Sequence, residues 1–183
     1  MVLPGHLGGG YLAAKALLSL LHPAFSAAKI NLLLIIGTLA GEFPDIDLIR
    51  AYFAGKSSRE YKDEDHRNYF THTPFIWLLI SLLVIFFGYV ISSSFTRYIG
   101  LMILAGSWSH LLLDSIEYGV MWLWPFSKKR YSLIKKIPEA NITARPGTIR
   151  AHLQFVEGAY LHTWTFWAEL AITFVAIIVF FNS

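Results

Sequence analysis

The sequence predicts an all-α membrane protein, a polytopic bundle of about five apolar helices with a polar site at one membrane face. Of its 183 residues, 55% are hydrophobic and only 15% are charged, and the mean hydropathy is +0.51. Soluble domains carry about 25% charged residues. At this length we expect a single membrane-embedded domain, residues 1–183. The chain has no cysteine, so a metal ion would have to be bound by imidazole and carboxylate groups.

Five apolar segments account for the predicted helices, and a full span needs about 20 such residues. The first two are short, and Lys15 weakens the first of them as a span. The third and fifth are the clearest spans, and the fourth becomes polar in its last turns. In chain order the segments cover residues 6–22, 28–43, 75–91, 98–113 and 163–181.

A short connection at 92–97 joins the third and fourth segments and predicts an antiparallel hairpin. The long polar loops 44–74 and 114–162 then lie on one side of the membrane. Two stretches in these loops, 50–67 and 128–150, contain 12 of the 15 Lys and Arg residues. Positive loops face the cytoplasm, so we expect that side to be cytoplasmic. The same pattern explains the basic net charge, and we expect no nucleic-acid partner.

The helix ends on this predicted cytoplasmic side carry most of the histidine and aspartate that could bind a metal ion. The opposite face offers only His22, Lys29 and Arg97, with no acid. A random distribution would place about half of such groups on each face. The candidate metal ligands on the one face are His6, Asp45, Asp47, His66, His72, His110 and Asp114.

The strongest local signal is the stretch "HLLLD". His110 and Asp114 are four residues apart, so they share one face of a helix and can bind one ion. Zinc binds imidazole nitrogen and carboxylate oxygen at about 2.0–2.2 Å. A simple His–Asp hydrogen bond at a helix end would explain the same pair.

Two further stretches, "PDID" and "HRNYFTHT", contribute one or two ligands each. Asp45 and Asp47 point in different directions if they are helical, so one would face the site and the other would cap a helix or orient a histidine. Their spacing does not choose between them. His66 and His72 precede a span, and Arg67 is either a phosphate-binding group or an ordinary loop charge.

Other ionisable groups are weaker candidates. His152, Glu157 and His162 could be additional ligands. Glu169 lies inside the last apolar segment, where an ionisable group is a functional candidate by default. A buried ion pair with Lys15 would also explain it.

An ordered set of motifs resembles the family of membrane-bound metal-dependent hydrolases, some of which are described as LexA-regulated. The motifs are His6 followed by small residues, then "GEFPDID", "HRxxxTHT", "GSWSHLLLD" and "WPFS", and they extend to Ser127. That family is distantly similar to zinc-dependent phospholipase C and related nucleases. The resemblance implies as ligands His6, one of Asp45 and Asp47, one of His66 and His72, and the pair His110 and Asp114.

The resemblance also implies an activity, hydrolysis of a phosphoester such as a phospholipid headgroup by zinc-activated water. Asp45 or Asp47 would be the general base, and Arg67 would stabilise negative charge. The later H-x-x-x-E ligand pair of the soluble enzymes has no clean match, so we expect one or two ions. The alternative is a non-catalytic divalent-metal scaffold, sensor or transport protein in the same membrane.

Overall fold

The computed structural model describes residues 3–46, 69–117, 119–134, 143, 149–158 and 160–182. Within these residues all regular elements are helical, apart from an isolated bridge between Val120 and Tyr131. The elements are α1 (Leu3–Leu21), α2 (Ala27–Ala40), η1 (Phe43–Asp45), η3 (Phe70–His72), α5 (Pro74–Val90), α6 (Ser94–Asp114), α7 (Ile149–Gly158), η4 (Tyr160–His162) and α8 (Trp164–Phe181).

Local signals in the chain explain where these helices begin. Pro74 opens α5 at a position where its missing N–H has no helical partner. Ser93 caps α6 by accepting a hydrogen bond from the backbone N–H of Thr96, and Thr163 caps α8 in the same way through Phe166. The five predicted apolar segments are therefore five helices, with boundaries within a few residues of those expected.

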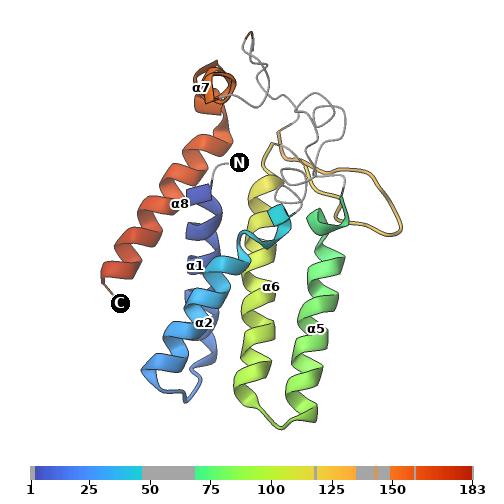
Figure 1. Ribbon diagram of the computed structural model, residues 1–183, viewed down its shortest axis with the longest axis vertical. Coiled ribbons are helices and arrows are strands. Elements are labelled where there is room, and N and C mark those ends of the chain that lie inside the picture. The colour runs from blue at the N-terminus through green and yellow to red at the C-terminus, as the bar shows by residue number, and fades with distance from the viewer. Residues whose placement is uncertain are drawn as a thin grey trace.

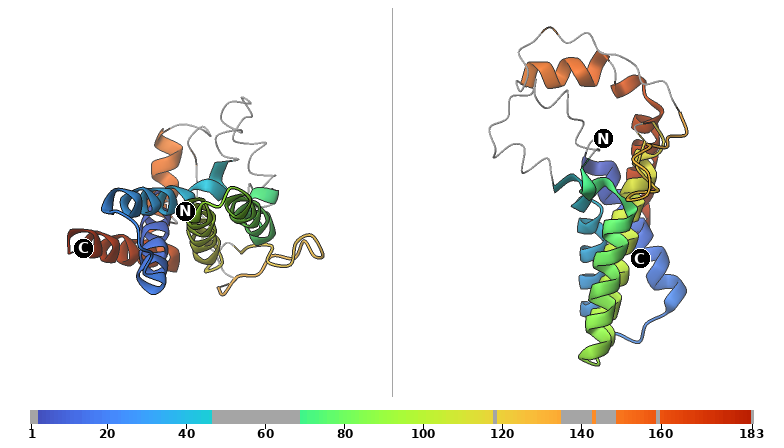
Figure 2. Two further views of the ribbon diagram at one scale, coloured as in Figure 1. Left: turned by 90° about the horizontal axis from the view of Figure 1, so that it is seen from below. Right: turned by 90° about the vertical axis from the view of Figure 1, so that its right-hand side faces the viewer.

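The helices form a row in which α8 and α5 lie at opposite ends (Figures 1 and 2). Helix α1 packs against α8, α2 and α6, and α6 packs against α5. The predicted hairpin is present, since α5 and α6 are joined by the turn at 91–93 and run antiparallel. The first turns of α1, α5 and α8 and the last turns of α2 and α6 consequently lie at the same end of the molecule.

Small residues let the central helices approach one another closely. A Cβ atom added at Gly106 of α6 would collide with the carbonyl oxygen of Gly37 in α2, and one added at Gly41 would collide with the carbonyl oxygen of His6. Small residues of this kind are typical of helix contacts in membranes. They bring the backbones of α1, α2 and α6 together at the end where the polar residues gather.

The outward faces of the helices are strongly apolar. Phe86 on α5 and Phe174 on α8 are 66% and 64% exposed. Among the described helices, α8 is the one long and apolar enough to cross a membrane by length and composition, while α2 and α5 are apolar but shorter. All five predicted helices thus exist, and the length criterion supports a membrane span for α8.

Candidate metal centre

Helix α6 places His110 and Asp114 one turn apart, both fully buried. The Nε2 atom of His110 lies 3.7 Å from Oδ2 of Asp114. This separation exceeds the usual hydrogen-bond length of 2.7–3.2 Å. The pair shares one face of the helix, as its spacing predicts, and the two groups approach one another without a direct hydrogen bond.

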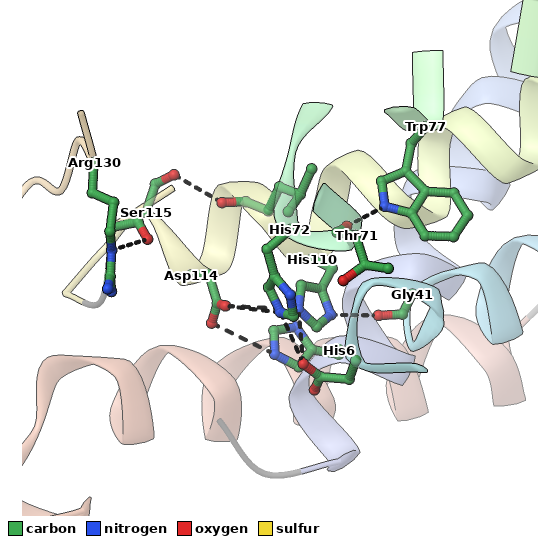
Figure 3. A network of polar contacts seen from close by, with 12 residues as sticks. His6, Gly41, Thr71, His72, Trp77, His110, Asp114, Ser115 and Arg130 are labelled. Atoms are coloured by element: carbon green, nitrogen blue, oxygen red, sulfur yellow. Dashed lines mark hydrogen bonds and ion pairs between the residues drawn. The ribbon is translucent and has the colours of Figure 1, made fainter. Parts of the chain in front are cut away.

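A backbone carbonyl orients the imidazole of His110. Its Nδ1–H donates a hydrogen bond of 2.7 Å to the carbonyl oxygen of Gly41, at the end of α2 (Figure 3). This bond leaves the Nε2 lone pair directed into the cluster, which is how histidine ligands of metals are commonly held. The residue at 41 must be glycine, because a side chain there would displace the backbone at His6.

The imidazole of His6 lies against that of His110. The two rings stack with centroids 3.6 Å apart and an interplanar angle of 15°. The Nε2 atom of His6 is 3.9 Å from Oδ1 of Asp114. Within the described residues, neither ring nitrogen of His6 has a hydrogen-bond partner, although the side chain is buried. Burying a polar group without a partner is costly.

The short helix η1 brings Asp45 to the same point. Its Oδ1 atom accepts a hydrogen bond of 3.0 Å from Nε2 of His72 and lies 3.6 Å from Nε2 of His110. Burial by itself would raise the pKa of Asp45, but the bond from His72 and the two nearby imidazoles hold that pKa well below its usual range. Asp45 is 17% exposed and is the most accessible member of the cluster.

His72 reaches the cluster from the turn η3, before α5. The indole Nε1–H of Trp77 donates a buried hydrogen bond of 2.6 Å to the carbonyl oxygen of Thr71 and so fixes this turn (Figure 3). The Nε2 atom of His72 then lies 4.0 Å from Oδ2 of Asp114. Three imidazoles from α1, η3 and α6 thus direct Nε2 toward two carboxylates, one from η1 and one from α6.

The arrangement fits a divalent cation. Ligand atoms of His6, Asp45 and His110, and likewise those of His72, His110 and Asp114, lie within 4.8 Å of one another. In a tetrahedral zinc site with bonds of 2.0–2.1 Å, neighbouring ligand atoms are roughly 3.3 Å apart. The separations of 3.6–4.0 Å are therefore close to those in a metal shell, and too long for hydrogen bonds. A cation would also give the buried nitrogens of His6 and His110 a partner.

The structure brings together five of the seven predicted ligands, His6, Asp45, His72, His110 and Asp114. The predicted residues Asp47, His66 and Arg67 lie outside the described residues. Of the weaker candidates, Glu157 and His162 are exposed, and the two groups of ligand atoms found among the described residues include neither of them.

The surrounding acids have roles that the sequence pattern does not reveal. Glu117 accepts hydrogen bonds of 2.9 and 3.2 Å from the backbone N–H groups of Trp164 and Thr165, and so caps α8 from a distant part of the chain. Glu169 accepts a hydrogen bond from the hydroxyl of Tyr160, whereas the sequence suggested Lys15 as its partner. The contact between Glu117 and Trp164 joins residues that are 47 positions apart, so no local spacing predicts it.

The sequence around Glu42 indicates only a charge at a helix boundary, but the structure places this residue in a different environment. It is half-buried at the end of α2, three residues before Asp45. Burial, together with the negative charge of Asp45, raises the pKa of Glu42 to about 7. The carboxyl group of Glu42, beside the cluster, therefore has a pKa near neutral pH, unlike that of Asp45.

Comparison with known proteins identifies a family. No curated protein and no solved structure matches the chain. The family model described as YdjM inner membrane protein matches residues 1–183, which includes every residue of the cluster and the apolar faces of the helices. The chain therefore belongs to the YdjM inner membrane protein family.

Proposed function

We propose that this protein is a membrane-bound metal-dependent hydrolase that cleaves a phosphoester, with a phospholipid headgroup as the expected substrate. The observation that carries the proposal is the mixed set of three imidazoles and two carboxylates, contributed by α1, η1, η3 and α6, with an accessible edge at Asp45. Mixed nitrogen and oxygen ligands are typical of catalytic zinc sites. The resemblance to metal-dependent hydrolases supports the same assignment.

The ligands we assign to the ion are His6, His72, His110 and Asp114, with Asp45 at the open side. Bound zinc would supply a nucleophile by lowering the pKa of water to about 7, and would polarise a phosphoryl oxygen. We expect one or two ions. The chain's own residues hold the ligands in place, since Gly41 orients His110 and the hydrogen bond from Trp77 fixes the turn that carries His72.

We assign proton acceptance to Asp45 or Asp47. Asp45 is the most accessible carboxylate of the cluster, and its partial exposure lets a substrate approach. The guanidinium of Arg67, which carries a permanent charge, is assigned to the phosphate of the substrate. The roles given to Asp47 and to Arg67 rest on the sequence alone.

The position of the cluster supports a lipid substrate. The cluster lies at the end of the bundle, where α1, α5 and α8 begin, and a site at this level meets lipid headgroups before other phosphoesters. Lys128, Lys129 and Arg130 follow α6 at the same end, so we propose that this end faces the cytoplasm and that the bundle crosses the membrane several times.

One observation favours a second function, a non-catalytic metal site that serves as a scaffold or sensor. His6, His72, His110 and Asp114 are each at most 1% exposed. Structural zinc sites are closed in this manner, whereas catalytic sites keep one position open. In this case metal removal would unfold the protein and no substrate would be turned over.

The test is to purify the protein in detergent, measure bound metal, and assay hydrolysis of phospholipids and simple phosphoesters. The wild type should contain zinc and release a phosphorylated headgroup, while Asp45→Asn should retain much of the metal and lose turnover by at least about 100-fold, the usual size of a general-base effect. Glu117→Gln is the matched control, because this buried acid caps α8 without joining the cluster. Metal without any turnover in the wild type would support the scaffold or sensor instead.

A further inference from the structure

Helices α1 and α8 run parallel and separate partway along α1. Gly5 of α1 lies against Glu169 of α8, Gly8 lies against Thr173, and the ring of Tyr11 meets that of Phe180 edge-on at 6.0 Å. Helix α8 ends one residue later, so none of the described helices packs on this side of the second half of α1. In Figure 1 the C-terminal end of α8 accordingly lies above the lower ends of α1 and α2.

A groove of about 870 Å³ lies beside the last turns of α8 and extends along α1 from Lys15 to Pro4. Its walls are mainly apolar and come from α1, α2 and α8, with Leu7, Leu34 and Ile177 as examples. The polar groups at the end far from the metal cluster are Lys15 and Asn31. Helix α1 rises about 1.5 Å per residue, which places Lys15 roughly 14 Å from His6 along the axis and roughly 9 Å from the end of the helix at Leu21.

Among the described residues that line this groove, Lys15 is the one cationic side chain and none carries a carboxylate. Among the described residues no ion pair involves Lys15. A cation inside an apolar layer is costly unless it meets a partner or extends to the interface. The groove therefore presents a long apolar surface with an uncompensated positive charge and an amide at one end.

We propose that this groove binds an anionic phospholipid of the leaflet opposite the metal centre. One acyl chain would lie along Leu34 and Ile177, and the phosphate would meet the ammonium of Lys15 and the amide of Asn31. This inference does not depend on the proposed hydrolase activity, because binding of a headgroup at Lys15 requires neither a metal ion nor catalysis.

The volume of the groove argues against a helix as the occupant. An α-helix about 10 Å wide with a pitch of 5.4 Å fills roughly 400 Å³ per turn, so the groove holds about two turns, far fewer than a membrane span needs. A flexible hydrocarbon chain fills such a space, and a net negative headgroup complements the charge of Lys15. The groove also opens toward outward faces that are apolar, with Ile35 54% exposed and Phe181 79% exposed.

The test uses the full-length protein in detergent and native mass spectrometry with two probes, phosphatidylglycerol and phosphatidylcholine with identical acyl chains. The wild type should bind phosphatidylglycerol several-fold more tightly than phosphatidylcholine. Lys15→Met should bind the two equally. Lys29→Met is the matched control, because Lys29 lies near the same end of the bundle but stacks over Phe25 and Phe95 outside the groove.

A second variant tests the apolar part of the groove. Ile177 is 50% exposed, so Ile177→Trp should fold while its larger ring fills the groove and weakens binding of both lipids. Metal content and unfolding temperature should stay at the wild-type values in both groove variants, which confirms folding. Equal binding of both lipids by the wild type would overturn the proposal, as would equal losses in Lys15→Met and Lys29→Met.

Discussion

Asp114→Asn tests the metal centre most sharply, because the substitution keeps the size of the side chain and removes its charge. The carboxylate of Asp114 lies 3.7, 3.9 and 4.0 Å from the Nε2 atoms of His110, His6 and His72. It is thus the acid that approaches all three imidazoles. If the cluster binds zinc, the main effect of the substitution is on the stabilisation that zinc confers.

The expected magnitude follows from mass action. At free zinc of 100 times Kd, the ion raises the free energy of unfolding by about 2.7 kcal/mol. Loss of a group that only supports a ligand weakens metal affinity by about 10–100-fold, so loss of a ligand should reach at least the upper value. At the same zinc concentration, the gain in Asp114→Asn should fall to about 0.4 kcal/mol.

The assay is thermal unfolding in detergent at pH 8, with zinc and with a chelator. For a chain of this size the wild type should gain about 5–11 °C from zinc, and Asp114→Asn about 1–2 °C. Glu117→Gln should unfold at a lower temperature in both conditions and keep the full gain from zinc, because its carboxylate caps α8. An equal loss in Asp114→Asn with and without zinc would refute the reasoning and indicate a purely structural His–Asp cluster.

Three further predictions concern groups around the cluster. In the chelated protein, the raised pKa of Glu42 makes the free energy of unfolding depend on pH: burial of the protonated carboxyl group costs little below pH about 4.5, and burial of the charged carboxylate lowers stability as pH rises through about 7. Glu42→Gln should therefore unfold at a higher temperature than the wild type at pH 8. At pH 4 the two proteins should unfold at the same temperature in a thermal scan. Gly106→Ala forces α6 away from the α2 backbone and should lower the free energy of unfolding by about 1–3 kcal/mol, measured by denaturant titration. Trp77→Phe removes the hydrogen bond to Thr71 and should weaken zinc affinity by about 10–100-fold in competition with a chelating dye, through a displaced His72.

The arrangement of the helices could be predicted from local patterns. The short connection at 92–97 fixes the direction of two helices, and the lengths of the apolar segments then place all the long polar loops at one end. The four-residue spacing of His110 and Asp114 fixes their common face in any α-helix. These features depend on residues that are close in the sequence, where spacing determines geometry.

The arrangement of the side chains within the cluster could not be predicted from the sequence, because it depends on contacts between distant segments. The hydrogen bond from His110 to Gly41 spans 69 residues, and His6 stacks on His110 from the start of the chain. Spacing left Asp45 and Asp47 equivalent, and only the packing of η1 against η3 brings Asp45 to His72. The groove beside Lys15 likewise depends on where α8 ends relative to α1.

The central claim, that His6, His72, His110 and Asp114 hold a metal ion with Asp45 at its open side, is tested most directly by zinc K-edge X-ray absorption on the detergent-purified protein. Zinc should be present in stoichiometric amount, with nitrogen and oxygen neighbours at about 2.0–2.1 Å and the outer-shell scattering of imidazole rings. His110→Ala should lose that signal. Protein that binds no stoichiometric metal, or zinc whose shell contains no imidazole, would contradict the account.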